Sequence, residues 1–241
     1  MAEVVAIVGP SGSGKSRSIS TLDPKTTIII AVDNKGLPFP GWKKYYTPFT
    51  AKEFDKGNYI HLDNSDKICK VLERISVERP EIKSVVIDDF QFIMGNEFMY
   101  KYNEKGYDKF SSIGYNGWIP IKTAKGLKRD DLTIFFLFHE ENTTDANYNP
   151  KKKIMTIGKM VDEKYTLEGM FRVVLFTETT HDPKTKTNTY KFTTQRDGVN
   201  TAKSPEGMFK EYAIDNDLEL VRTSIEKYDN GDITPIDLGI K

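Results

Sequence analysis

The chain has 241 residues, enough for one α/β domain with a full hydrophobic core. Lysine plus arginine equals aspartate plus glutamate at 35 each, which excludes an overall charge that attracts polyanions. Any nucleic-acid surface must therefore come from local clustering. One cysteine excludes an internal disulfide, and no apolar run reaches the length of a membrane span, so the sequence predicts a cytoplasmic protein without membrane contact.

The first element is a phosphate-binding loop. The apolar run 4–8 predicts a buried strand, a helix is predicted over residues 16–22, and a Gly, four residues, Gly-Lys-Ser pattern joins them. Lys15 is expected to reach the β- and γ-phosphates of a nucleotide, and the Ser16 hydroxyl to ligate Mg²⁺. A glycine-rich hairpin would leave Lys-Ser after the last glycine unexplained. The predicted nucleotide contacts are Gly9, Pro10, Ser11, Gly12, Ser13, Gly14, Lys15, Ser16 and Arg17.

Two further apolar strands end in acidic residues. Residues 26–32 precede Asp33 and Lys35, which are candidates for nucleotide chemistry or simply members of a polar turn. The run 83–87 ends in Asp88 and Asp89. Asp88 is predicted to hold the Mg²⁺ shell opposite Ser16.

The apolar run 132–138 predicts a third buried strand, which ends in His139 and Glu140. At this position His139 is a candidate γ-phosphate sensor, and the alternative is a histidine that satisfies backbone groups at a strand end. The loop 142–164 that follows is predicted to be mobile and basic, and so able to contact DNA, or else a solvated surface loop. Its lysines are Lys151, Lys152, Lys153 and Lys159.

The segment 105–118 shows neither a helical nor a strand period, and a helix is predicted after it over residues 119–129. Aromatic side chains beside a basic helix face are suited to single-stranded nucleic acid, although an ordinary loop with a solvated lysine face is equally compatible. The candidates are Tyr107, Lys109, Phe110, Tyr115 and Trp118 in the segment and Lys122, Lys125 and Arg129 on the helix face.

The remaining elements are predicted from period and breakers. Helices are expected over residues 64–79, 91–104 and 216–228, with another beginning at Ser204. A short strand is expected over 44–47, an antiparallel pair over 170–179 and 188–194, and an extended tail from 229. Met99 and Tyr102 are assigned to the core.

The phosphate loop, the strand ending in Asp33, SVVIDDF and FFLFHEEN together resemble the core of RecA-type recombinases, and more closely phage AAA-type nucleotide-binding proteins that include single-strand annealing proteins. This resemblance implies a P-loop ATPase core over residues 1–205, with a mainly parallel sheet covered by helices and an antiparallel C-terminal hairpin. Residues 206–241 form a helical extension of the same domain. The resemblance further implies ATP and Mg²⁺ as cofactors and assembly into rings or filaments. It implies single-stranded DNA and other recombination proteins as partners. It also implies that Arg196 or Lys203 reaches a neighbour's γ-phosphate.

One departure affects the chemistry. Where the family usually carries a glutamate that polarises the attacking water, this chain has Lys35. A lysine at neutral pH is no general base, so Asp33, Asp89 or Glu140 takes the role, or hydrolysis is slow and ATP acts as an assembly switch. A nucleotide-gated protein-interaction ATPase and a small-molecule or nucleotide kinase are the alternative functions.

Overall fold

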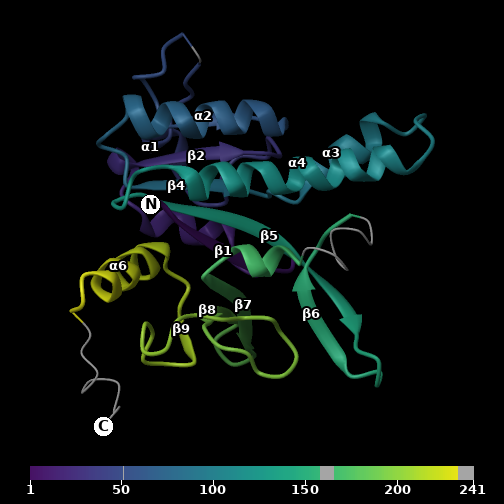
Figure 1. Cartoon of the computed structure of the whole chain (residues 1–241). Helices are drawn as coiled ribbons and strands as arrows, with labels where there is room; N and C mark the ends of the chain where they lie inside the picture. The colour runs from purple at the N-terminus through teal and green to yellow at the C-terminus, as the bar shows by residue number, and fades with distance from the viewer. Residues whose placement is uncertain (51, 158–165, 233–241) are drawn as a thin grey trace.

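A single mixed sheet forms the centre of the molecule (Figure 1). The structure, a computed structural model, describes residues 1–50, 52–157 and 166–232. Within them the strands run in the order β3-β2-β4-β5-β1-β7-β8-β9, and β6 pairs with β5 outside this row. The strands are β1 (Glu3–Gly9), β2 (Thr27–Ala31), β3 (Tyr59–His61), β4 (Ser84–Asp88), β5 (Thr133–Thr144), β6 (Pro150–Ile154), β7 (Val173–Asp182), β8 (Thr187–Thr193) and β9 (Ala213–Asp215).

The six strands from β3 to β7 in this row are parallel, whereas β8, β9 and β6 pair antiparallel. The parallel strands β1, β2 and β4 are continuous apolar runs because both faces of the sheet are covered. The predicted fold class, a mainly parallel α/β sheet with an antiparallel C-terminal hairpin, is confirmed. Because β5 lies between β1 and β4, the phosphate loop after β1 and the acidic end of β4 are two strands apart.

Alternate residues of β1 feed two hydrophobic clusters. Val4, Ala6 and Val8 face the cluster that includes helices α2, α3 and α4, while Val5 and Ile7 face the cluster that includes η1 and α6. The helices are η1 (Ser16–Thr21), η2 (Pro24–Thr26), α1 (Trp42–Tyr45), α2 (Ser65–Glu78), α3 (Phe92–Tyr100), α4 (Tyr107–Gly126), η3 (Leu167–Met170) and α6 (Leu218–Asp229). Since β9 extends the sheet and α6 covers its second face, residues 206–232 share the core of the preceding chain.

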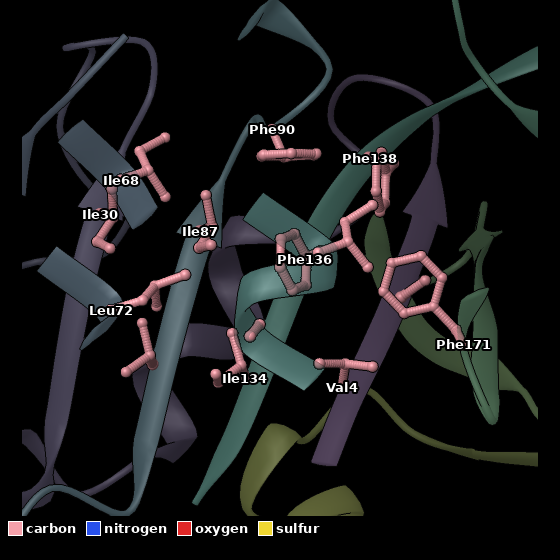
Figure 2. Packing of buried hydrophobic residues seen from close by; sticks show 14 of the residues in the cluster. Val4, Ile30, Ile68, Leu72, Ile87, Phe90, Ile134, Phe136, Phe138 and Phe171 are labelled. Carbon is pink, nitrogen blue, oxygen red and sulfur yellow. The ribbon is translucent and has the colours of Figure 1, made fainter. Parts of the chain in front are cut away.

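An aromatic cluster packs under the carboxyl ends of β4 and β5 (Figure 2). Phe90 meets Phe136 edge to face at 5.0 Å and Phe138 at 5.5 Å between ring centroids, and Phe171 meets Phe136 at 5.7 Å. Edge-to-face pairs of this kind add to the energy of simple burial. The cluster therefore fixes the strand ends that carry Asp89 and His139.

The largest correction to the sequence predictions concerns residues 105–118. Instead of an aperiodic loop, the chain forms the helix α4 from Tyr107 through Pro120 to Gly126. A Cβ on Gly117 would lie 2.8 Å from Sδ of Met94, so the glycine permits close packing of α4 against α3. The predicted helix 119–129 is the second half of α4, and Arg129 lies beyond its end.

Other boundaries also differ. Residues 42–45 form a helical turn rather than the predicted strand 44–47, and the segment at Ser204 forms turns instead of a helix. The predicted mobile loop 142–164 is a β5–β6 hairpin as far as Ile154, and Lys159 lies outside the described residues. Met99 and Tyr102 are 65 and 71% exposed and do not belong to the core. The tail beyond residue 232 also lies outside the described residues.

Among the described residues, no helix combines the length and apolar character needed to cross a membrane.

Candidate nucleotide site

The phosphate loop curls tightly around its own lysine. The Lys15 side chain is buried, and Nζ donates hydrogen bonds to the carbonyl oxygens of Gly9 and Pro10, each at 2.8 Å. Gly12 and Gly14 have φ angles of +77° and +96°, values that glycine adopts without strain. Burial lowers the pKa of Lys15 to about 8, against the opposing influence of Asp89.

Strand β7 supports the loop from the side. Thr177 donates a hydrogen bond of 2.7 Å to the Ser13 hydroxyl, which in turn donates to the Pro10 carbonyl at 2.7 Å. A Cβ on Gly9 would lie only 1.7 Å from Oγ1 of Thr177. Glycine at position 9 is therefore required by the close approach of β7.

The Ser16 hydroxyl lies directly against the acidic end of β4. Its Oγ donates to Oδ1 of Asp88 at 2.8 Å, although the two residues are 72 positions apart. Burial and then the neighbouring Asp89 charge raise the pKa of Asp88 to about 6. Hydroxyl and carboxylate oxygens are hard ligands that suit Mg²⁺, which takes few ligands from protein and the rest from phosphate and water. In the described part of the chain, no group of three or more His, Cys, Asp or Glu side chains is placed to hold a metal ion.

Asp89, the residue after β4, occupies a strained backbone conformation with φ +57° and is buried. Its carboxylate forms an ion pair with Nζ of Lys35, and its other oxygen lies 3.4 Å from Nε2 of His139. Burial works to raise the pKa of Asp89, but the polar contacts with His139 and Lys35 hold it below its usual value. Lys35 therefore neutralises the Asp89 carboxylate.

A cavity of about 400 Å³ opens between these groups, a size that suits a small ligand. It brings together the phosphate loop, the end of β2, Asp89 and the strand-end histidine. Its lining residues are Ser11, Gly12, Gly14, Lys15, Ser16, Arg17, Lys35, Gly36, Leu37, Pro38, Asp89, His139 and Tyr190. Leu37, Pro38 and Tyr190 were not predicted from the sequence. Leu37 and Pro38 follow the carboxyl end of β2, where the strand-end rule points, but Tyr190 gives no local signal because only the β7–β8 pairing brings it here.

Several predicted residues lie elsewhere. Asp33 is exposed and does not line the cavity, and Glu140 is buried in an ion pair with Lys152 at 3.1 Å. Lys203 pairs through its backbone with Val174, near the start of β7, and does not line the cavity. Arg196 is exposed and also absent from the lining, so any role for these two cations at a γ-phosphate requires a neighbouring subunit.

Most of the predicted DNA-binding cations already have protein partners. Lys109 is buried over the Phe98 ring, and Lys125 donates to the Met170 carbonyl. Arg129 bonds Asp131 and backbone carbonyls of residues 76, 80 and 82. The register of the β5–β6 hairpin sets Lys153 opposite Glu141 and places Lys152 within reach of Glu140, and Lys151 donates to the Gly198 carbonyl. Lys122 remains exposed, and the Trp118 ring is packed against the core.

Comparisons with family models and with curated proteins gave no match. Among solved structures, a KaiC-like protein from the hyperthermophilic archaeon Pyrococcus horikoshii OT3 aligns over 84% of this chain and 83% of that chain, with 11% sequence identity and a TM-score of 0.49. At this level of likeness the comparison decides nothing about activity. The functional assignment therefore depends on the geometry of the site.

Proposed function

We propose that this chain is an Mg²⁺-dependent ATPase whose turnover is slow and coupled to a conformational or assembly switch. The observation that carries the proposal is the 2.8 Å hydrogen bond between Ser16 and Asp88, beside a phosphate loop that holds Lys15. A glycine-rich linker has no reason to meet a buried acidic strand end in this way. Ser16 and Asp88 are the residues that would hold Mg²⁺, which would offset the charge of the phosphates.

We assign Asp89 as the general base that activates the attacking water. When water attacks the γ-phosphorus, the bond to the β–γ bridging oxygen breaks, ADP leaves with the electron pair, and Asp89 accepts a proton from the water. His139 orients the carboxylate through its 3.4 Å contact. The Lys35 ion pair weakens Asp89 as a base, since it holds the pKa low, and slow hydrolysis follows.

A second activity, binding of single-stranded DNA, is supported by one surface. Helices α3 and α4 extend beyond the sheet on one side (Figure 1). Large apolar and aromatic side chains of these helices and of the segment between them are exposed. Bases stack on such side chains with little sequence preference. Since most nearby cations are engaged, this binding depends on stacking more than on phosphate contacts. The exposed residues are Met99, Tyr100, Tyr102, Tyr107, Phe110 and Tyr115.

A role in phage recombination or annealing, within a ring or filament, is the cellular setting that the sequence resemblance suggests. A trans contribution of Arg196 or Lys203 belongs to that setting. We call the exposed aromatic surface of α3 and α4 the tyrosine surface. If it binds no DNA, a protein-interaction ATPase is the alternative function. If phosphate passes to an acceptor other than water, kinase activity is the alternative.

The test is ATP hydrolysis with and without single-stranded DNA, comparing wild type with Lys15→Ala. We expect hydrolysis to fall at least a hundredfold in the variant, because it loses the ammonium that contacts the transferred phosphate. Lys25→Ala, at an exposed lysine outside the cavity, is the matched control. Equal rates in wild type and Lys15→Ala would remove the ATPase assignment.

The DNA surface is tested by Tyr107→Ala combined with Tyr115→Ala. We expect about tenfold weaker binding of a fluorescent oligonucleotide, with Tyr45→Ala as an exposed tyrosine control on another surface. Unchanged DNA binding in the double variant would exclude the tyrosine surface as the contact.

A further inference from the structure

One buried side chain beside the phosphate loop has no hydrogen-bonding partner. Asn216 is 5% exposed, and both its Oδ1 and Nδ2 atoms are buried without a bond. A carboxamide that gives up water and gains no partner destabilises the fold. Such a group is retained where a ligand supplies the missing bonds.

Asn216 packs against Gly14 beside the nucleotide cavity and is not one of the residues that line it. A Cβ on Gly14 would lie 3.3 Å from both Oδ1 and Nδ2 of Asn216 and 2.8 Å from Cδ1 of Tyr190, so the amide and the ring converge over one point of the phosphate loop. The chain holds Asn216 there, because Leu218 at the start of α6 donates to Oγ1 of Thr21 at 3.0 Å. Gly14 and Tyr190 themselves line the cavity.

The face of the Tyr190 ring is already used for stacking. The Arg17 guanidinium lies over it, 5.2 Å from the ring centroid. Both side chains line the cavity. A planar nucleobase makes the same kind of contact with an aromatic ring or with a guanidinium.

We propose that Tyr190, Arg17 and Asn216 form the base subsite of this nucleotide site and make it selective for adenine. Tyr190 and Arg17 stack on the base. Asn216 reads its edge, with Oδ1 accepting from the adenine amino group and Nδ2 donating to a ring nitrogen. The inference rests on the proposed function, because it assumes that the phosphate loop binds a nucleoside triphosphate.

The selectivity follows from the pattern of donors and acceptors. The N6 and N7 edge of adenine offers a donor and an acceptor, which a single carboxamide matches in pairs. The corresponding edge of guanine offers two acceptors, O6 and N7, so the Asn216 oxygen meets no donor there. A good bidentate contact of this kind corresponds to about 5- to 150-fold discrimination.

The experiment measures the dissociation constants of Mg²⁺ complexes of ATP, GTP and inorganic tripolyphosphate by calorimetry. Wild type should bind ATP at least fivefold more tightly than GTP. Asn216→Ala removes both the acceptor and the donor, and should reduce this preference to less than twofold while tripolyphosphate binding is unchanged. Asn147→Ala, on the exposed β5–β6 turn, makes the same truncation away from the site.

Tyr190 provides the second variant. Tyr190→Ala should weaken ATP and GTP by about the same factor, tenfold or more, and leave tripolyphosphate unaffected, while Tyr190→Phe retains both affinities. This variant keeps the inference testable if Asn216→Ala does not fold, as judged by thermal unfolding.

The outcomes separate the inference from the function on which it rests. If wild type binds tripolyphosphate and shows equal affinity for ATP and GTP, or if neither Asn216→Ala nor Tyr190→Ala changes base-dependent affinity, the base subsite is wrong and the phosphate site stands. If wild type binds none of the three ligands and Lys15→Ala changes nothing, the proposed function itself fails.

Discussion

The two edges of the parallel sheet carry similar charged residues, but these residues are paired differently at the two edges. At the amino edge, Arg172 bridges Glu3 at 3.0 Å and Asp229 at 2.7 Å, and Asp131 pairs with Lys83 and Arg129. Those contacts raise the pKa of Arg172 and lower that of Asp131. At the carboxyl edge, Lys15 forms no ion pair among the described residues and bonds backbone carbonyls instead.

The larger cavity lies at the amino edge, about 680 Å³ against about 400 Å³. Size therefore does not identify the site. What distinguishes the carboxyl edge is a buried cation with only neutral acceptors beside two buried carboxylates whose pKa values move apart. Charges that satisfy each other stabilise a fold, whereas the Lys15 ammonium, which bonds only backbone carbonyls here, is available to an anionic ligand.

The largest expected effect is that of Asp89→Asn. Removing the proposed base should lower ATP turnover by about 10²- to 10⁴-fold in a steady-state assay, while ATP binding stays within a few fold. Asp131→Asn is the matched control, since it neutralises an aspartate at the opposite edge and should leave turnover unchanged. Turnover equal to wild type in Asp89→Asn would exclude Asp89 as the base.

The pH dependence of Mg²⁺-ATP binding comes next. Asp88 must be ionised to hold Mg²⁺, so affinity should fall about tenfold per unit as the pH drops below about 6. Lys15 must be protonated, so affinity should also fall as the pH rises above about 8. Titration by fluorescence between pH 5 and pH 9.5 checks both limbs, and a flat profile would contradict these assignments.

The raised pKa of Asp88 also predicts how the stability of the fold changes with pH. The folded state binds the Asp88 proton more tightly than the unfolded state does. The stabilisation from this proton is therefore complete below about pH 4 and is lost as the pH rises through about 6. Asp88→Asn keeps an oxygen for the Ser16 hydroxyl and removes the buried charge. We expect a higher melting temperature than wild type at pH 7.5, no difference at pH 4, and weakened Mg²⁺-ATP binding. A lower melting temperature at pH 7.5 would contradict this.

Lys35→Ala should have a smaller effect on turnover, in the opposite direction. Without its cation, Asp89 regains a higher pKa because burial then dominates, and a stronger base speeds hydrolysis about threefold to tenfold. The measurement is single-turnover hydrolysis, with Lys52→Ala as an exposed lysine control. A loss of turnover would show instead that Lys35 contacts the phosphate.

How far the sequence predicts this molecule differs between the strands and the site. Local patterns were sufficient for the phosphate loop and for the continuous apolar strands, because glycine spacing and burial on both faces are encoded within a few residues. The helix α4 was missed because its glycines and Pro120 lower helix propensity, while packing of Gly117 on Met94 favours it.

The remaining errors share one cause, which is pairing between distant segments. In the sequence alone, the basic run Lys151, Lys152 and Lys153 indicates a phosphate-binding surface. In the structure, the β5–β6 register places this run beside Glu140 and Glu141. Similarly, Tyr190 and Asn216 reach the cavity through the β7–β8 hairpin and the start of α6. No local pattern contains that information.

The smallest expected effect belongs to the amino edge. Arg172→Ala removes two ion pairs that are partly exposed, and such pairs contribute about 0.2 to 1 kcal/mol each, so the free energy of unfolding should fall by about 1 kcal/mol. Nucleotide binding and turnover should be unchanged, because no phosphate meets this edge. Urea unfolding measures the loss, with Arg74→Ala, which removes an exposed helical pair with Glu78, as a surface control. A change in ATP affinity in Arg172→Ala would show that the two edges are coupled. The ion pairs of the amino edge would then contribute to nucleotide binding as well as to stability.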